Sequence, residues 1–297
     1  MSTISALSSI SVKRAYKSKK PIDLVNLPKM IAREPFIVPD LSIDPFRLHQ
    51  VFTHTSITSD VSQNNRRFSF LGDAMANMLI AYIVTKTTKA CNVGTQKAHL
   101  QSDKNFIRWA FLLKFPDLEL SEVPLSKTSK FHATVFEAYV GAVAYSLMKK
   151  DIPEGDVFVA LIDWFKSLIV ATDPTKSLPL HIFSHGHDNC IGQAANANIL
   201  GGEVIRYVFT KMVFMRLPQG SLHQLETARS GIFKSKRYQV LKKKGLPFVQ
   251  GPKKGNILLQ EVGQFLLQSA DPQDFTHRLE ELEHAHLRLF RKPRATP

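Results

Sequence analysis

Residues 64–74 of this 297-residue chain read NNRRFSFLGDA, and an apolar stretch follows them directly. Met75, Met78, Leu79 and Tyr82 continue this stretch at helical spacing. Apolar residues that recur three and four positions apart lie on one face of a helix. The segment therefore predicts a helix that buries this face in the protein.

Two further segments accompany this stretch in a fixed order. Residues 54–56 read HTS upstream, and residues 136–142 read FEAYVGA downstream. Residues 64–74 resemble the signature of ribonuclease III, which runs approximately Asn-Glu-Arg-Leu-Glu-Phe-Leu-Gly-Asp-Ala. The other two segments are similar to the family's His-x-Ser and Asp-x-Phe-Glu-Ala-x-x-Gly-Ala motifs. The resemblance covers residues 42–170 and implies an all-α, ribonuclease-III-like helical domain.

The resemblance also implies where carboxylates are needed to cut double-stranded RNA. Magnesium prefers oxygen ligands, and at a phosphodiester it must activate water and offset charge on the leaving oxygen. Family members use four acids per domain, and these positions fall on Ser69, Asp73, Thr134 and Glu137. Because a neutral hydroxyl binds metal much more weakly than a carboxylate, we expect no catalysis, no metal and no other cofactor. The alternatives are a structural magnesium, or carboxylates kept for helix capping or for pairing with a base such as Arg67.

The C-terminal half contains a weaker copy of the same pattern. The aligned positions are residues 199–203 with residues 70–74 at an offset of 129, Ser230 with Ser102 at 128, and Gly263 with Gly141 at 122. The pattern predicts a second, degenerate ribonuclease-III-like copy. Its four acid positions become Asn198, Gly202, Asn256 and Leu259, none of which can perform the chemistry. A double-stranded-RNA-binding domain is not indicated, because three alternating strand-like runs are missing.

Ribonuclease III domains work as pairs, so the resemblance implies a pairing partner for each copy. The two copies could pair within one chain, or one copy could pair with another protein of the same kind. The sequence leaves both open. Near the C-terminus, the spacing of Phe275, Leu279, Leu282 and Leu289 predicts a last helix over residues 272–290 that packs on the domain.

The composition suggests how the chain is divided. The first 22 residues contain no acid and are rich in Ser, Lys and Arg, which is typical of a mitochondrial presequence. The alternative is a disordered basic arm that binds nucleic acid. The expected divisions are a cleaved presequence (1–16), a basic extended arm (17–41), the first ribonuclease-III-like domain (42–172), a linker (173–180), the second copy (181–290) and a basic tail (291–297).

The net charge of +14 and the pI near 9.8 indicate a polyanionic partner, which on this scaffold means RNA. The alternative for most of these charges is ordinary solvated surface. The candidate RNA-binding residues are Lys127, Lys130, Lys234, Lys236, Arg237, Lys242, Lys243, Lys244, Lys253, Lys254, Arg288, Arg291, Lys292 and Arg294.

Three other features are not expected. The only cluster with metal-like spacing contains His181, His185, His187 and Cys190, and no Cys-x-x-Cys accompanies it to complete a zinc site. With two cysteines there is no disulfide framework, which favours a reducing compartment. No uninterrupted apolar run approaches the length of a bilayer span; residues 78–84 are of ordinary helical length.

The chain combines an inactive ribonuclease-III-like site with a basic charge and a presequence-like start. In this combination it resembles the ribonuclease-III-like proteins of the mitochondrial large ribosomal subunit. That resemblance implies a structural constituent of this subunit in the matrix. Its partners would be large-subunit ribosomal RNA and neighbouring mitochondrial ribosomal proteins, with a second ribonuclease-III-like protein as a candidate for pairing. The alternatives are an active mitochondrial endoribonuclease that uses Asp73 and Glu137 with acids from a partner subunit, and an assembly factor.

Overall fold

The computed structural model describes residues 43–88, 92–149, 154–172, 190–235, 238–239, 257–269 and 271–290. Within these ranges the chain forms ten α-helices, one short 3-10 helix and no strand. The expected all-α class is therefore confirmed for the described part of the chain. The predicted presequence, basic arm, linker and tail lie outside the described residues.

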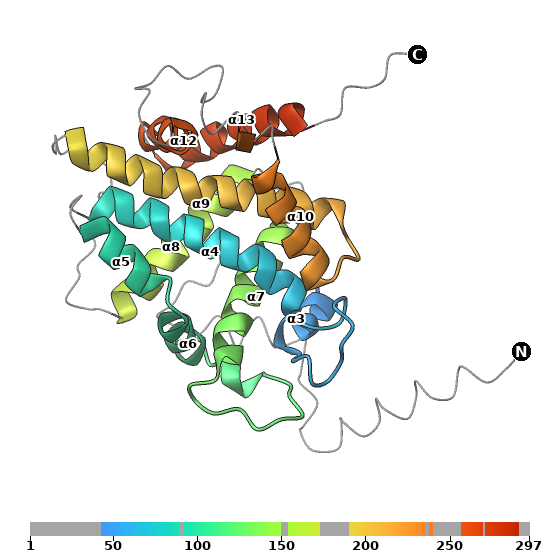
Figure 1. The fold of residues 1–297 in the computed structure, drawn as a ribbon. Coiled ribbons are helices and arrows are strands. Elements are labelled where there is room, and N and C mark those ends of the chain that lie inside the picture. Colours follow the sequence, from blue (N-terminus) through green and yellow to red (C-terminus); the bar gives the residue numbers. More distant parts are fainter. Residues whose placement is uncertain are drawn as a thin grey trace, which may run out of the picture.

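The helices follow one another in two series (Figure 1). The first series is α3 (Pro45–Phe52), α4 (Arg66–Thr87), α5 (Val93–Leu100), α6 (Asp103–Leu112), η2 (Phe115–Asp117), α7 (Lys130–Met148) and α8 (Glu154–Thr172). The second series is α9 (Cys190–Arg216), α10 (Leu222–Lys234), α12 (Ile257–Leu267) and α13 (Pro272–Phe290). The last helix has the bounds expected from its apolar spacing, and Phe275, Leu279 and Leu282 are buried on it.

Helix α4 is the central element of the core. It contains the motif of residues 64–74 except its first two residues, and nearly all of its side chains are buried. At 22 residues it is longer than the ordinary helix that the sequence suggested. By length and composition alone α4 could cross a membrane, but in this structure other helices cover most of it.

The crossing of α4 and α7 brings two backbones into contact. A Cβ atom at Gly72 would collide with the carbonyl oxygen of Glu137, and one at Gly141 would collide with the carbonyl oxygen of Phe68. Side chains at a helix crossing normally keep the axes about 8–10 Å apart. Glycine at both positions removes this spacer, so the two motifs quoted from the sequence meet at one point.

The crossing of α9 and α12 is built in the same way. A Cβ at Gly201 would collide with the carbonyl oxygen of Leu259, and one at Gly263 with that of Ala197. On α9 these positions lie 129 residues after those on α4, and on α12 they lie 122 residues after those on α7. These are the offsets of the sequence alignment.

Helices α4 and α9 lie side by side and run in opposite directions, with α7 on the far side of α4 and α12 on the far side of α9 (Figure 1). Arg67, at the start of α4, donates hydrogen bonds to the carbonyl oxygens of Phe214 and Leu217 at the end of α9. Its guanidinium carbon also lies 4.1 Å from the centroid of the Phe214 ring. One arginine thus satisfies carbonyl groups that the end of a helix leaves without partners.

The other end of α4 is tied to the C-terminal half by a second cation. Lys86 Nζ donates to the carbonyl oxygens of Leu267 and Ser269, at 2.8 and 3.0 Å, where α12 ends. Nearby, the rings of Tyr82 on α4 and Phe275 on α13 lie 4.2 Å apart. The two series of helices therefore share one core along the whole of α4.

One aligned pair is not equivalent in the structure. The Ser102 side chain caps α6 by accepting a hydrogen bond from the Asn105 backbone N–H. Ser230 instead lies exposed inside α10 and caps no helix. The match at an offset of 128 was therefore wrong, because a single serine in a helical segment does not reveal where the helix begins.

Replacing Gly72 or Gly263 by alanine should lower the free energy of unfolding by about 3 kcal/mol, because the added methyl group forces two backbones apart. The control is Gly231→Ala in α10, where no atom lies within 4 Å of the added carbon. That change should stabilise the protein by about 0.5–1 kcal/mol through helix propensity. Urea unfolding measures all three variants. An unfolding midpoint of Gly72→Ala equal to that of the wild type would contradict the close crossing.

Candidate functional site at the crossing of α4 and α7

The four positions expected from the ribonuclease III motifs lie on two helices. Ser69 and Asp73 are one turn apart on α4, and Thr134 and Glu137 are one turn apart on α7. The Ser69 hydroxyl donates to the carbonyl oxygen of Arg66 at 3.0 Å. The Thr134 hydroxyl donates to the carbonyl oxygen four residues earlier in its own helix, at 3.3 Å. Both hydroxyl groups are therefore engaged by backbone rather than by a shared site.

Asp73 is held by partners on two helices. Its Oδ2 lies 2.6 Å from Nη2 of Arg206 on α9, and its Oδ1 accepts a hydrogen bond of 2.7 Å from Asn77 on α4. Burial raises the pKa of Asp73, and the positive charge of Arg206 opposes this rise. The base suggested by the sequence, Arg67, is not the partner. Arg67 donates instead to carbonyl groups at the end of α9, because the N-terminus of α4 lies next to the C-terminus of α9.

Glu137 is largely removed from solvent and lies near two other acids. Burial, followed by the negative charges of Asp73 and Asp103, raises its pKa from 4.5 to about 8. The carboxyl group is then mostly protonated at neutral pH. A bound cation would lower this pKa again, so the raised pKa describes Glu137 among its protein neighbours alone.

Only two of these four positions carry a carboxyl group, which is few for a divalent metal site. The four positions offer two backbone-bonded hydroxyl groups, one carboxylate paired with a guanidinium and one buried carboxyl group. Across the described residues, no group of three or more His, Cys, Asp or Glu side chains is placed to hold an ion. Neither Asp73 nor Glu137 caps a helix, since both lie within helices.

The four positions that the sequence alignment predicts for a second copy carry no carboxylate. Asn198 donates its side-chain amide to the carbonyl oxygen of Ala194 at 3.1 Å. Gly202 faces the side chain of Leu259 across the α9–α12 crossing. Asn256 lies outside the described residues, as do His181, His185 and His187. Cys190 is the first residue of α9.

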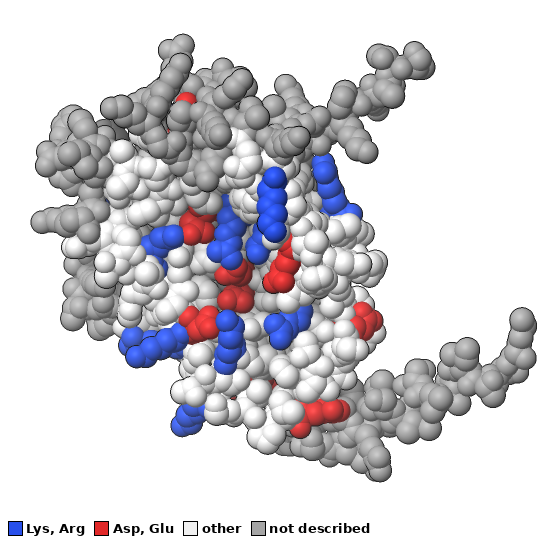
Figure 2. Space-filling view, viewed as in Figure 1, with Lys and Arg blue, Asp and Glu red and all other residues white. Residues whose placement is uncertain are grey.

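Charged side chains of both signs surround Asp73. Figure 2 shows basic and acidic groups intermingled on this face of the molecule. The ion pairs around the site are Lys97–Glu203 at 2.6 Å, Lys130–Asp103 at 3.0 Å and Arg206–Asp73 at 2.6 Å. Most of these charges are therefore compensated within the protein.

No family model and no curated protein matches this chain. The interpretation of the site therefore depends on its own geometry and on the motifs.

Three candidate RNA-binding residues have described side chains, and all three are exposed. These are Lys127, Lys130 and Lys234. Lys130 is the member that forms the ion pair with Asp103. Arg288 lies on α13, but its side chain is outside the described part, as are the other ten candidates. The part of the chain that carries most of the predicted basic clusters is thus not described.

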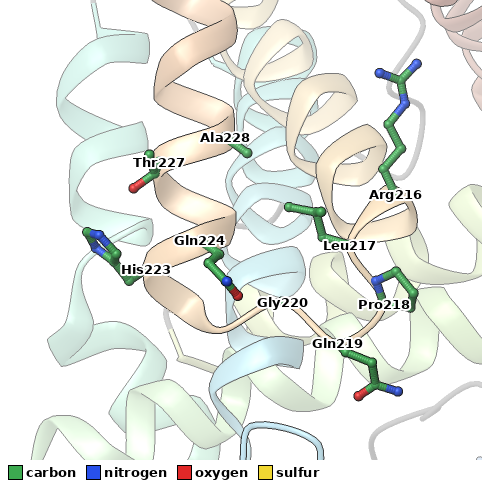
Figure 3. Close-up of a pocket in the computed structure, with 9 residues that line it drawn as sticks. All are labelled: Arg216, Leu217, Pro218, Gln219, Gly220, His223, Gln224, Thr227 and Ala228. Carbon is green, nitrogen blue, oxygen red and sulfur yellow. The ribbon is translucent and has the colours of Figure 1, made fainter.

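Two pockets lie away from Asp73. One, of about 720 Å³, is formed where α9 turns into α10 (Figure 3). Its lining residues are Arg216, Leu217, Pro218, Gln219, Gly220, His223, Gln224, Thr227 and Ala228. None of them is a carboxylate, so this pocket lacks the ligands of a magnesium site. The other pocket, of about 430 Å³, includes Lys127 and His132 in its wall. His132 there bonds the Glu119 carboxylate through Nδ1 and the carbonyl oxygen of Ser126 through Nε2.

Sequence reasoning missed the residues that surround Asp73. Arg206 and Asn77 bond its two oxygens, and Arg229 on α10 adds a second guanidinium nearby. One feature of the sequence pointed to Arg206, because at an offset of 129 it aligns with Asn77, which lies four residues after Asp73. The alignment alone did not show that Arg206 contacts Asp73, since that contact depends on the antiparallel packing of α4 and α9.

Glu137→Gln should stabilise the protein increasingly as pH rises from about 4.5 to 8. In this window the unfolded wild-type chain loses the Glu137 proton while the folded protein keeps it, so wild-type stability falls with pH. Glutamine has no such proton. Because Glu137 keeps some contact with solvent, the gain at pH 8 should be about 3 kcal/mol or less. Urea unfolding at several pH values measures it, with the exposed Glu122→Gln as control. The same pH dependence in both variants would contradict the raised pKa.

Proposed function

We propose that this protein is a catalytically inactive, ribonuclease-III-like structural constituent of the mitochondrial large ribosomal subunit that binds ribosomal RNA. The ion pair between Asp73 and Arg206 carries the proposal. A guanidinium from the second half of the chain occupies one oxygen of the remaining carboxylate, and an amide occupies the other. The framework around the acid is kept while its capacity for metal chemistry is removed.

The two glycine crossings support a tandem arrangement of ribonuclease-III-like copies. Each crossing uses the same reciprocal backbone contacts, at Gly72 and Gly141 in one and at Gly201 and Gly263 in the other. The packing of α4 on α9 supports pairing of these copies within one chain. This favours internal pairing over pairing with a second ribonuclease-III-like protein, because the face of α4 that such a partner would need is covered.

The ribosomal assignment is supported by charge and by resemblance. A net charge of +14 suits a protein that holds folded RNA through phosphate contacts, which supply affinity without reading sequence. The motif of residues 64–74 supplies the link to ribonuclease III, and the acid-free first 22 residues supply the link to mitochondria. The matrix is the proposed location.

Sedimentation tests the ribosomal role. In gradients containing magnesium, the protein should travel with mitochondrial large subunits at a ratio of one per particle, and it should remain there after a high-salt wash. Quantitative mass spectrometry of the fractions measures this ratio against known large-subunit proteins. An assembly factor would instead be enriched on precursor particles and missing from mature ones, which would overturn the proposal.

A cleavage assay tests the loss of catalysis. With magnesium and duplex RNA, the full-length protein should produce no more cleavage than Asp73→Asn, because the wild-type carboxylate is already bound by Arg206 and Asn77. Denaturing gels of end-labelled RNA measure the products, and an active ribonuclease III serves as positive control. Magnesium-dependent cleavage by the wild type that disappears in Asp73→Asn would establish an endoribonuclease instead.

A further inference from the structure

Arg206 and Arg229 reach the same place from two helices. Arg206 projects from α9 to Asp73. Arg229 projects from α10, with its guanidinium carbon 4.6 Å from the centroid of the Phe70 ring. Arg229 Nη1 also donates to the hydroxyl of Thr210 at 3.2 Å, and that hydroxyl donates to the carbonyl oxygen of Arg206 at 2.7 Å. The aromatic face and the threonine therefore fix Arg229 within one helical turn of Arg206.

Arg206 and Arg229 carry two positive charges, and among the described residues Asp73 is the carboxylate that forms an ion pair with this pair of arginines. Arg206 has one ion-pair partner, and Arg229 has no ion pair with any residue that the structure describes. Arg229 is partly buried, and its pKa is lowered first by burial and then by the charge of Arg206. Asp73 and Glu226 oppose this effect without forming an ion pair with it. A partly buried cation that lacks an ion pair can gain free energy from a bound anion.

We propose that Arg206 and Arg229 form a phosphate-binding site, and that its ligand is a phosphodiester of folded RNA. A guanidinium offers two parallel N–H groups that match two phosphate oxygens, and two guanidinium groups from different helices can hold one phosphate. Phe70 and Thr210 orient the Arg229 side chain before the ligand arrives. The Arg206 side chain is 38% exposed, so a phosphate can reach it from solvent.

The choice of RNA as the source of the phosphate rests on the proposed function. Inorganic phosphate presents the same oxygens, so the geometry of the two arginines alone does not separate the two sources. RNA is favoured by the net charge of +14, because a polyanion gains from every further cation near the site whereas a single phosphate ion does not.

The test uses the full-length protein and a short RNA duplex, with affinity measured by fluorescence anisotropy over a range of salt concentrations. Arg229→Gln should weaken binding by about three- to tenfold near 0.1 M salt and reduce the slope of log K against log salt by about one. Arg206→Gln should act in the same direction. The matched control is Arg108→Gln on α6, an exposed arginine outside this site, which should leave the slope unchanged.

Asp73→Asn distinguishes a phosphate site from a merely structural cluster. Removal of the carboxylate charge frees Arg206 for the ligand. The affinity of this variant for the duplex should therefore be equal to that of the wild type or up to about threefold higher. A structural cluster would instead give lower unfolding midpoints for Asp73→Asn and Arg229→Gln with unchanged salt slopes. Urea unfolding confirms that each variant is folded, and Arg229→Lys, which keeps the charge, should retain most of the affinity.

The outcomes separate the two proposals. If the wild-type protein binds the duplex but Arg229→Gln keeps its salt slope, this site is excluded and RNA binding remains. If the wild type binds no duplex or ribosomal RNA, RNA binding itself falls. Inorganic phosphate provides the last comparison. If it raises the unfolding midpoint of the wild type but not of Arg229→Gln, and if it does not displace RNA, then the site binds free phosphate. That result would contradict RNA as the ligand.

Discussion

The contact between the backbones of α4 and α7 determines the rest of the site. Because Gly72 and Gly141 lack side chains, each helix approaches a carbonyl group of the other. Any larger residue would move Asp73 and Glu137 apart and open the core that α4 shares with α7. The same constraint applies to Gly201 and Gly263 in the second half. Two crossings of this kind, with α4 packed on α9, give the protein its central layer of helices.

The close approach of the helices brings two carboxyl groups together, and the protein stabilises them with its own side chains. Two carboxyl groups come near one another in a partly buried place, where repulsion and desolvation both oppose ionisation. One of them, Asp73, is stabilised as a carboxylate by Arg206 and Asn77. The other, Glu137, retains its proton to about pH 8. The second half of the chain thus provides the cation that stabilises the remaining charge of the first.

Local features of the fold could be predicted from the sequence. The last helix was predicted with its observed bounds, because its apolar residues repeat at helical spacing and a proline begins it.

The partners of Asp73 could not be predicted in the same way. They depend on which face of α4 meets α9 and in which direction, and helical periodicity specifies neither. Arg67 was the nearest base in sequence, yet the antiparallel packing brings it to the end of α9 and brings Arg206 to Asp73 instead. Ser230 is a second example, because it aligns with the helix-capping Ser102 in sequence but lies inside α10 rather than at its start.

The long separation in sequence between α4 and its cover has a consequence for biosynthesis. A nascent chain emerges from its N-terminal end, so Arg66–Thr87 is complete well before Cys190–Arg216 has left the exit tunnel. Until then the face of α4 that packs on α9 is open, and the carbonyl groups that Arg67 binds at the end of α9 have not been made. Such an exposed apolar helix is prone to aggregate until its cover is made.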